Sequence, residues 1–211
     1  DNFSFEEAMK KKVSFFKKYT HIINTSIHKK YINKKYKNEF DLDKKFINRF
    51  KKIEFIYFFL NSRKIYEQKE NISELSKISP IDTYAFNKYR TENYLKKRVG
   101  KNLVSLRISN VVGKRILDCK RNNHKLFLDN LIVYRKQKKK LYINDDFKDF
   151  ITIQQFYLII ERIIKLKITG IYNISLSKKV YVSEIVRWLD KNFLKNIVFN
   201  KAKKDSFTLS N

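Results

Sequence analysis

The chain has 211 residues, of which 43% are hydrophobic, and a formal net charge of +27; this length allows a buried core and excludes a small disulfide-stapled protein. The longest apolar runs, such as Phe55–Leu60 and Phe156–Ile160, are far shorter than the roughly 20 residues of a membrane-spanning helix, so we expect no membrane span. The single cysteine, Cys119, cannot form an intrachain disulfide, and no apolar leader opens the sequence; both favour a reducing, cytoplasmic setting.

Helices and strands alternate along the first half of the chain. Phe5–Tyr19 carries apolar residues at a helical period, and the β-branched run His21–Thr25 predicts a buried strand. Asp43–Lys51 predicts a second helix. Phe55–Leu60 is continuously apolar, which is typical of a strand buried on both faces of a parallel sheet.

The alternation continues after a loop at Ser79-Pro80. Good helix formers fill Tyr84–Arg98, and Gly100 is placed to end that helix. The later predicted elements are a strand over Leu103–Val112, a helix near Phe127–Lys136, a strand over Lys140–Ile143, a helix over Ile153–Leu166, a strand over Gly170–Ile174, and a helix over Val182–Phe193 with Ser183 as its cap and Glu184 in its first turn. This order predicts a parallel α/β sheet.

The spacing Tyr84-x-x-x-Lys88 carries the clearest chemistry. On a helix, residues i and i+4 lie on one face, so a phenol and an ammonium would be neighbours. A free phenol has a pKa of about 10, and a cation within roughly 4–6 Å favours the phenolate, so the pair could move a proton at a carbinol. In a chain with 13 tyrosines and many lysines, however, this spacing also occurs by chance.

Two further motifs follow predicted strands. Ser62 comes directly after the run Phe55–Leu60, and Leu106–Gly113 ends the next predicted strand. Open α/β sheets build their ligand sites at the carboxyl ends of strands. The sequence therefore predicts that Ser62, Tyr84 and the end of the Leu106–Gly113 segment lie at one edge of one sheet.

Together these motifs resemble the extended short-chain dehydrogenases/reductases, in particular the nucleotide-sugar epimerase/dehydratase branch. Asn61–Tyr66 is similar to the family's Ser-Ser-x-x-Val-Tyr stretch, Pro80–Glu92 to its Pro-x-x-x-Tyr-x-x-x-Lys-x-x-x-Glu helix, and Leu106–Gly113 to its Leu-Arg-x-x-Asn-Val-Tyr-Gly strand. Lys148–Ile151 is similar to Arg-Asp-Phe-Ile, and Gly170–Ile174 to Gly-x-Tyr-Asn-x.

The resemblance implies a partial Rossmann-like, doubly wound parallel sheet with a small C-terminal substrate-binding subdomain. Residues 1–113 would be the C-terminal part of the cofactor domain. Residues 114–211 would be mostly the substrate-binding subdomain, with 151–175 returning to the sheet. The implied activity is that of an epimerase, dehydratase or reductase that uses NAD or NADP on a nucleotide sugar, in surface-polysaccharide precursor synthesis.

The family's residue roles transfer to matching positions. Tyr84 would be the general acid/base, Lys88 would hold the nicotinamide ribose and lower the pKa of Tyr84, and Ser62 would hydrogen-bond the reacting oxygen. The expected binding residues are Ser26 beside the cofactor and Asn110 and Lys148 at the substrate. Simpler roles are a strand end for Asn110, a surface lysine for Lys148, and core positions for Tyr172 and Trp188.

We expect no metal site, because His21, His28 and His124 are scattered and Cys119 has no partners. The resemblance also implies a homodimer. Its interface would be the helices over Asp43–Lys51 and Tyr84–Arg98, with an apolar face near Phe86, Tyr89 and Asn93.

Several family features are replaced or missing. The glycine-rich turn that binds the cofactor pyrophosphate is not in this sequence, whose glycines are Gly100, Gly113 and Gly170. Asp1–Ser4 resembles a segment that follows the family's third strand, so we expect a processed product or a fragment of a longer chain. Such a fragment would neither bind NAD(P) tightly nor turn over a nucleotide sugar, and the strand His21–Thr25 would keep an unpaired edge.

Three single-residue replacements accompany these differences. Asp41 or Asp43 stands in place of a structural asparagine, Val112 in place of a tyrosine, and Lys148 in place of an arginine. A lysine still neutralises phosphate but lacks the bidentate fork of arginine.

The positive charge supports an alternative function. A net charge of +27 favours polyanions, and a catalytically silent Rossmann-like protein could hold an anionic partner on its basic surface. The lysines are dispersed, however, with the densest runs at Lys10–Lys12 and Lys136–Lys140. We therefore expect no specific nucleic-acid partner.

Overall fold

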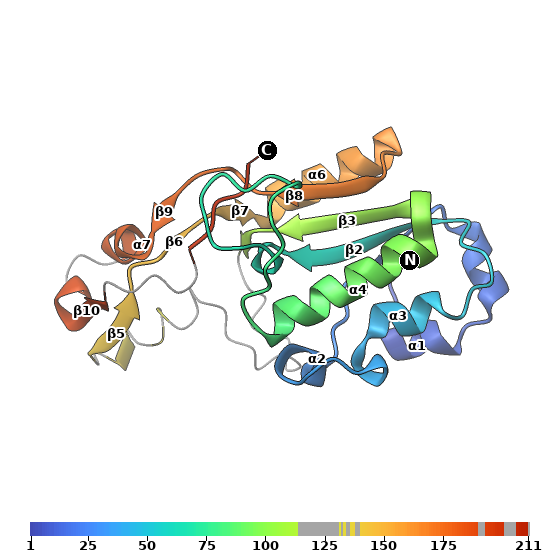
Figure 1. The fold of residues 1–211 in the computed structure, drawn as a ribbon, viewed down its shortest axis with the longest axis horizontal. Helices are drawn as coiled ribbons and strands as arrows, with labels where there is room; N and C mark the ends of the chain where they lie inside the picture. Colours follow the sequence, from blue (N-terminus) through green and yellow to red (C-terminus); the bar gives the residue numbers. More distant parts are fainter. Residues whose placement is uncertain are drawn as a thin grey trace.

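A four-stranded parallel sheet forms the centre of the protein, as the sequence predicted (Figure 1). The computed structural model describes residues 1–113, 131, 133, 136–137, 140–189, 193–200 and 206–210. The strand order is β1-β2-β3-β8, and the strands are β1 (His21–Asn24), β2 (Ile56–Ser62), β3 (Leu103–Ile108) and β8 (Gly170–Ile174). Because all pairs are parallel, the carboxyl ends of the strands meet at one edge.

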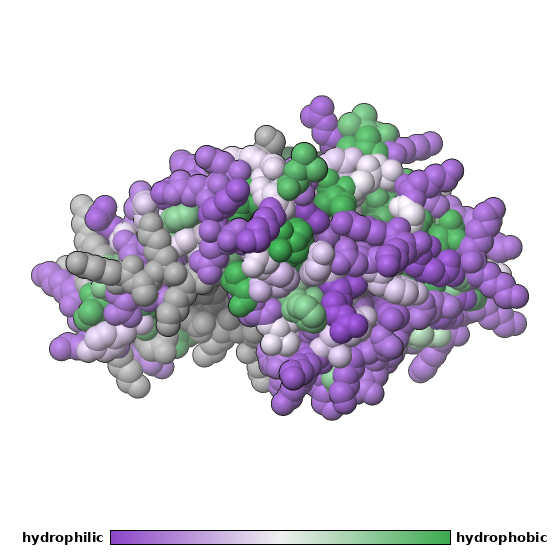
Figure 2. Space-filling model, in the orientation of Figure 1, coloured by the Kyte–Doolittle hydropathy of each residue, from purple (hydrophilic) through white to green (hydrophobic). Residues whose placement is uncertain are grey.

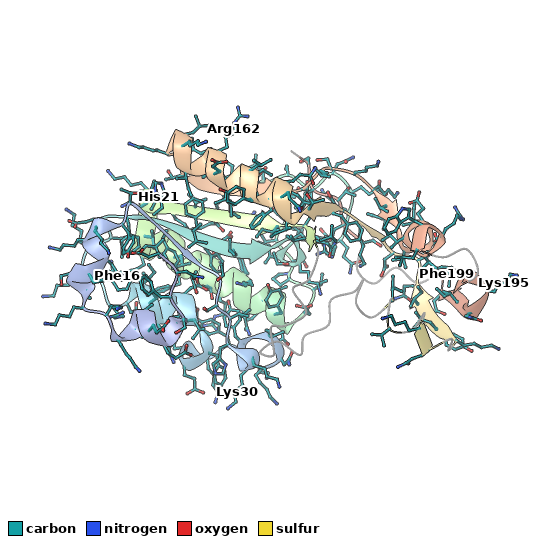
Figure 3. All side chains as sticks on the ribbon, turned by 180° about the vertical axis from the view of Figure 1, so that it is seen from behind. Phe16, His21, Lys30, Arg162, Lys195 and Phe199 are labelled. Carbon is teal, nitrogen blue, oxygen red and sulfur yellow. The ribbon has the colours of Figure 1, made fainter. Side chains whose placement is uncertain are left out.

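Helices cover both faces of this sheet. One face packs against α1 (Phe5–Lys10), the 3-10 helix η1 (Val13–Lys18), α3 (Leu42–Ile47) and α4 (Thr83–Val99). Phe16, labelled in Figure 3, is on that side. Its ring lies 5.2 Å from that of Phe46 and 5.7 Å from that of Phe50, measured between ring centroids. The other face packs against α6 (Ile153–Leu166) through Phe58 and Leu106. Side chains that alternate along each strand thus fill two cores.

Shorter elements complete the described chain. They are α2 (Lys29–Asn33), η2 (Asn38–Phe40), η3 (Arg63–Ile65), η4 (Gly100–Asn102), β4 (Asn110–Val112), β5 (Leu141–Asn144), β6 (Phe147–Lys148), β7 (Phe150–Thr152), β9 (Val180–Tyr181), α7 (Val182–Leu189), η5 (Phe193–Asn196) and β10 (Ile197–Asn200). β4 pairs with β7 and β5 with β10 in parallel, whereas β6 and β9 are antiparallel. No helix among the described residues has the length and apolar character to cross a membrane.

Two predicted elements are divided in the structure. The expected helix Phe5–Tyr19 is split into α1 and η1 by extended backbone at Lys11 and Lys12, which lets Met9 and Phe16 reach the same core. The expected strand Leu103–Val112 is split at Ser109 into β3 and β4, because β4 leaves the main sheet to pair with β7. The expected helix Asp43–Lys51 is shorter and begins at Leu42, capped by Asp41.

Near the C-terminus, two predictions were wrong. Ser183 does not cap α7; it lies inside the first turn and donates its hydroxyl to Asp145 at 2.9 Å, while Glu184 accepts the Tyr181 N–H at 2.6 Å. Trp188 is 83% exposed rather than in the core. Val182 and Val186 form the buried face of α7, and a residue two positions after Val186 lies on the opposite side of a helix. Most of the predicted helix Phe127–Lys136 lies outside the described residues. Cys119 and His124 also lie outside them.

A buried ion pair joins α4 to β3. The Arg107 guanidinium donates to both Glu92 carboxylate oxygens at 3.1 and 2.7 Å, and the Ser105 hydroxyl donates to one of them at 2.6 Å. Burial alone would raise the pKa of Glu92, but the hydrogen bonds and charge of Arg107 outweigh it and hold the pKa below its usual value. Glu92 therefore stays ionised inside the core.

A second buried carboxyl, that of Asp43, joins α3 to β1 and β2. Its Oδ1 accepts the Asn24 side-chain amide at 2.9 Å and the Tyr57 hydroxyl at 2.7 Å. Burial raises the pKa of Asp43, and the charge of Lys88 and these two hydrogen bonds offset that rise only in part. Ionised Asp43 therefore opposes folding relative to its neutral form.

We predict that Glu92→Gln lowers the free energy of unfolding by about 3–5 kcal/mol, because it leaves the buried Arg107 charge uncompensated. Equilibrium urea unfolding at pH 7 measures this loss. Glu161→Gln is the matched control, because Glu161 pairs with Lys165 at 2.8 Å on the exposed surface of α6, and its unfolding midpoint should not move. Equal losses in both variants would contradict the assignment.

We predict that Asp43→Asn becomes more stabilising as pH rises. An amide oxygen at this position can accept both hydrogen bonds, and the wild-type chain loses stability as pH rises from the unfolded pKa through the raised folded pKa of Asp43. The difference in unfolding free energy, variant minus wild type, should therefore grow between pH 3.5 and pH 8. A difference that shrinks over this range in urea titrations would show that Asp43 favours its ionised form.

Candidate active site

Ser62 and Tyr84 lie at the same edge of the sheet. Ser62 is the last residue of β2, and α4 contacts η3, which follows it directly. Lys64 in η3 donates to Asp82, the N-terminal cap of α4, at 3.0 Å, and Tyr84 is in the first turn of that helix. The N-terminal end of α4 therefore meets the carboxyl ends of the strands (Figure 1).

Lys88 is buried against Tyr84. Its ammonium donates to the Leu60 carbonyl at 2.7 Å and lies 4.6 Å from the centre of the Phe59 ring and 5.9 Å from that of Tyr84. Only 6% of the residue is exposed, so the aromatic faces and the carbonyl replace water around the charge. The predicted i,i+4 neighbours are thus side by side. Their helix runs from Thr83 to Val99, and Gly100 caps its C-terminal end with a positive φ of 61°, which favours glycine.

The hydroxyls of Tyr84 and Ser62 remain available. Tyr84 is half-buried, and no residue in the described part of the chain hydrogen-bonds its hydroxyl. The Ser62 Oγ accepts the Lys64 backbone N–H at 3.3 Å, and within the same described ranges its hydroxyl proton has no acceptor. Both groups can therefore bond a third molecule at this edge.

Ser26 is connected to this region through β1. Its backbone N–H donates to the Asn24 side-chain oxygen at 2.9 Å, and Asn24 in turn donates to Asp43. Asp43 interacts electrostatically with Lys88. Ser26 also lines a cavity of about 150 Å³ that follows β1 and the first residues of the chain, with Asn24 and His21. In the described chain, β2 is the one strand hydrogen-bonded to β1.

Asn110 and Lys148 form a separate group around Asp149. The Asn110 backbone and side-chain N–H groups both donate to the Asp149 carbonyl, at 3.1 and 2.9 Å. Lys148 is 5% exposed, so the simpler role as a surface lysine was wrong. No hydrogen bond among the described residues joins these two side chains to Ser62, Tyr84 or Lys88.

Sequence reasoning named no role for two buried charged residues near these positions. Arg107 pairs with Glu92, and Asp149 accepts the backbone N–H of Leu176 at 3.1 Å while burial raises its pKa. A charged residue inside the buried strand Leu103–Ile108 signals a buried partner, so Arg107 could have been found. Within the ranges that the structure describes, no three His, Cys, Asp or Glu side chains cluster as metal ligands do.

No protein-family model matches the chain, and no curated protein matches it. Solved structures do match its fold. UDP-N-acetylglucosamine 4-epimerase from Methanobrevibacter ruminantium, in complex with UDP-N-acetylmuramic acid, has a TM-score of 0.73 at 18% identity, covering 97% of this chain and 72% of that one.

Two further enzymes show the same similarity. dTDP-4-dehydrorhamnose reductase from Bacillus anthracis, in complex with NADP, has a TM-score of 0.72 at 13% identity, covering 98% of this chain and 75% of that one. UDP-glucuronic acid 4-epimerase from Bacillus cereus, in complex with NAD, has a TM-score of 0.68 at 17% identity, covering 96% of this chain and 69% of that one. The chain therefore has the Rossmann-like α/β fold of these nucleotide-sugar epimerases and reductases, which its motifs predicted.

Proposed function

We propose that the chain carries the proton-transfer site of a nucleotide-sugar epimerase, dehydratase or reductase of the extended short-chain dehydrogenase/reductase family. The observation that carries this proposal is the position of Tyr84 beside the buried ammonium of Lys88, with Ser62 at the same sheet edge. The fold similarity to three such enzymes supports it. The site holds groups that can exchange a proton with a sugar hydroxyl.

The residues present fit a nicotinamide cofactor at Lys88 and Ser26. A lysine ammonium has three N–H donors, and the Leu60 carbonyl takes one of them, so the others can bind ribose hydroxyls. NAD or NADP would supply the hydride exchange with a sugar carbon. Tyr84 would take the hydroxyl proton as that carbon is oxidised and return it on reduction, while Ser62 would donate a hydrogen bond to the same oxygen.

The second group of residues would serve the substrate. We propose that Asn110 and Lys148 face the diphosphate of a nucleotide sugar, since a buried lysine is a point charge suited to phosphate. Two of the similar structures are named for UDP-sugar epimerases and one for a dTDP-sugar reductase.

Surface-polysaccharide precursor synthesis is the setting we propose. The single cysteine is in keeping with a reducing, cytoplasmic compartment.

We also propose the division of the chain into a cofactor part, residues 1–113, and a substrate-binding part, residues 114–211. Residues 151–175 would belong to the sheet rather than to the second part. In support, β8 pairs with β3 and α6 packs on the main sheet, whereas β5, β6, β9 and β10 pair among themselves.

We predict that Tyr84→Phe lowers kcat by about 10²–10⁴-fold, because it removes the proton carrier while keeping the ring beside Lys88. The protein expressed from its complete reading frame is incubated with NAD or NADP and UDP- or dTDP-sugars, and products are separated by chromatography. Tyr89→Phe on the same helix is the control and should retain activity. An unchanged kcat in Tyr84→Phe would remove the proposed mechanism.

We propose further that two copies pair through α3 and α4. On α4, Phe86 is 48% exposed, and Tyr89 and Asn93 follow it at helical spacing. We predict that the product of the complete reading frame sediments as a dimer at micromolar concentration and that Phe86→Glu shifts it to monomer by placing a charge in the interface. Leu75→Glu, at another exposed position, should leave the dimer intact. Monomeric wild-type protein would refute this pairing.

A silent binding protein is the alternative function. The net charge of +27 and the lack of a glycine-rich turn within these 211 residues favour it, and Figure 2 shows hydrophilic residues over most of the face that carries α3 and α4. Calorimetric titration with NAD and NADP, carried out on this chain and on the complete reading-frame product, distinguishes the enzyme from the silent binding protein. Cofactor binding by the complete product supports the enzyme, and its failure to bind either cofactor supports the alternative.

A further inference from the structure

Lys88 and Glu92 contact consecutive residues at the end of β2. The Lys88 ammonium donates to the Leu60 carbonyl at 2.7 Å, and the Glu92 carboxylate accepts the Asn61 side-chain N–H at 2.9 Å. Residues 88 and 92 are one helical turn apart and share a face of α4. The helix therefore holds β2 at two adjacent points just before Ser62.

Asn61 passes this contact on to Ser62. Its side-chain oxygen accepts the Ser62 backbone N–H at 2.8 Å, while its side-chain nitrogen is on Glu92. Asn61 is buried, and both ends of its amide are used. Among the described residues no α4 side chain hydrogen-bonds Ser62 directly, so a hydrogen-bonded route from α4 to the Ser62 backbone needs an intermediate residue. The Asn61 amide supplies that route.

The chain needs such a constraint at this position. Ser62 is the last residue of β2 and is paired with Ile108 of β3, and the backbone turns at once into η3. Strand pairing therefore holds Ser62 from the side of earlier residues alone. Glu92 is itself fixed by Arg107, which donates to both of its carboxylate oxygens. Tyr84, Lys88 and Glu92 are spaced at i, i+4 and i+8 along α4. Glu92, which holds Ser62 through Asn61, is therefore on the same helical face as Tyr84, the proposed proton carrier.

We propose that Asn61 and Glu92 are positioning residues that hold Ser62 in fixed register with Tyr84 and Lys88. The expected effect on kcat rests on the proposed function, whereas the expected effect on the Ser62 backbone rests on the hydrogen bonds alone. Small displacements of a group that binds the reacting oxygen lower the rate of the chemical step more than they weaken substrate binding. Glu92 therefore contributes to the site through Asn61, in addition to pairing with Arg107.

The test compares Asn61→Ala with Ser105→Ala. Each variant removes one hydrogen bond to the same Glu92 oxygen, but only the first also frees the Ser62 N–H. Amide hydrogen exchange of the 211-residue chain, followed by NMR, should be at least tenfold faster at Ser62 in Asn61→Ala and unchanged there in Ser105→Ala. The amides of Phe58 and Leu106, within β2 and β3, are the internal reference.

The kinetic arm uses the complete reading-frame product. Asn61→Ala should lower kcat about tenfold with KM for the nucleotide sugar within twofold, and Ser105→Ala should change neither. Should Asn61→Ala not fold, Asn61→Ser, whose side chain is too short to reach Glu92, replaces it in both arms. Equal effects of the two substitutions on Ser62 exchange and on kcat would overturn the inference and leave Asn61 a purely structural residue.

The two arms separate this inference from the proposed function. If the wild-type protein is inactive with every nucleotide sugar tried, the proposed function fails, and Ser62 exchange still decides whether Asn61 fixes this residue. If the protein is active but Asn61→Ala changes neither exchange nor kcat, the inference alone fails.

Discussion

The structure depends on how α4 places polar groups against an apolar sheet. Tyr84, Lys88 and Glu92 form a polar stripe on the buried side of this helix, and burying a charge is costly unless partners satisfy it. The Leu60 carbonyl satisfies Lys88, and Arg107 with Asn61 satisfies Glu92. Because these partners are on β2 and β3, satisfying the stripe fixes the helix along the strands, and this places the first turn of α4, which contains Tyr84, at their carboxyl edge.

The distribution of charge follows from the same constraint. The chain has a large excess of lysine, and its exposed surface carries most of it, yet carboxyls such as Asp43, Glu92 and Asp149 are buried. Each of them accepts hydrogen bonds from side chains or backbone N–H groups. Burial nevertheless raises the pKa of Asp43 and Asp149, whereas the paired guanidinium lowers that of Glu92. The guanidinium in direct contact with Glu92 thus outweighs the effect of burial on its pKa, whereas the groups around Asp43 and Asp149 offset that effect only in part.

The solved structures that share this fold are only 13–18% identical to the chain. At that level, comparison of the whole sequence finds no match, whereas short motifs still indicated the fold. Core positions of a parallel sheet accept many combinations of apolar residues of similar volume, and this chain fills them with phenylalanine, tyrosine and isoleucine such as Phe58, Tyr57 and Ile174. The proposed site makes narrower demands on sequence than this core does, because it needs a phenol beside an ammonium and a hydroxyl at the end of a strand.

The sequence by itself determined the four strands of the main sheet, their parallel arrangement, and the pairing of Tyr84 with Lys88, because periodicity and i,i+4 spacing are local properties of the chain. It did not indicate α2 or the short strands β6, β7, β9 and β10. It could not determine the break between α1 and η1 or the outward position of Trp188, which depend on which face meets a core. It also could not show that Asn61 connects Glu92 to Ser62 or that Lys148 is buried. Those contacts join residues far apart in the chain, and only the packing of helices on the sheet brings them within hydrogen-bonding distance.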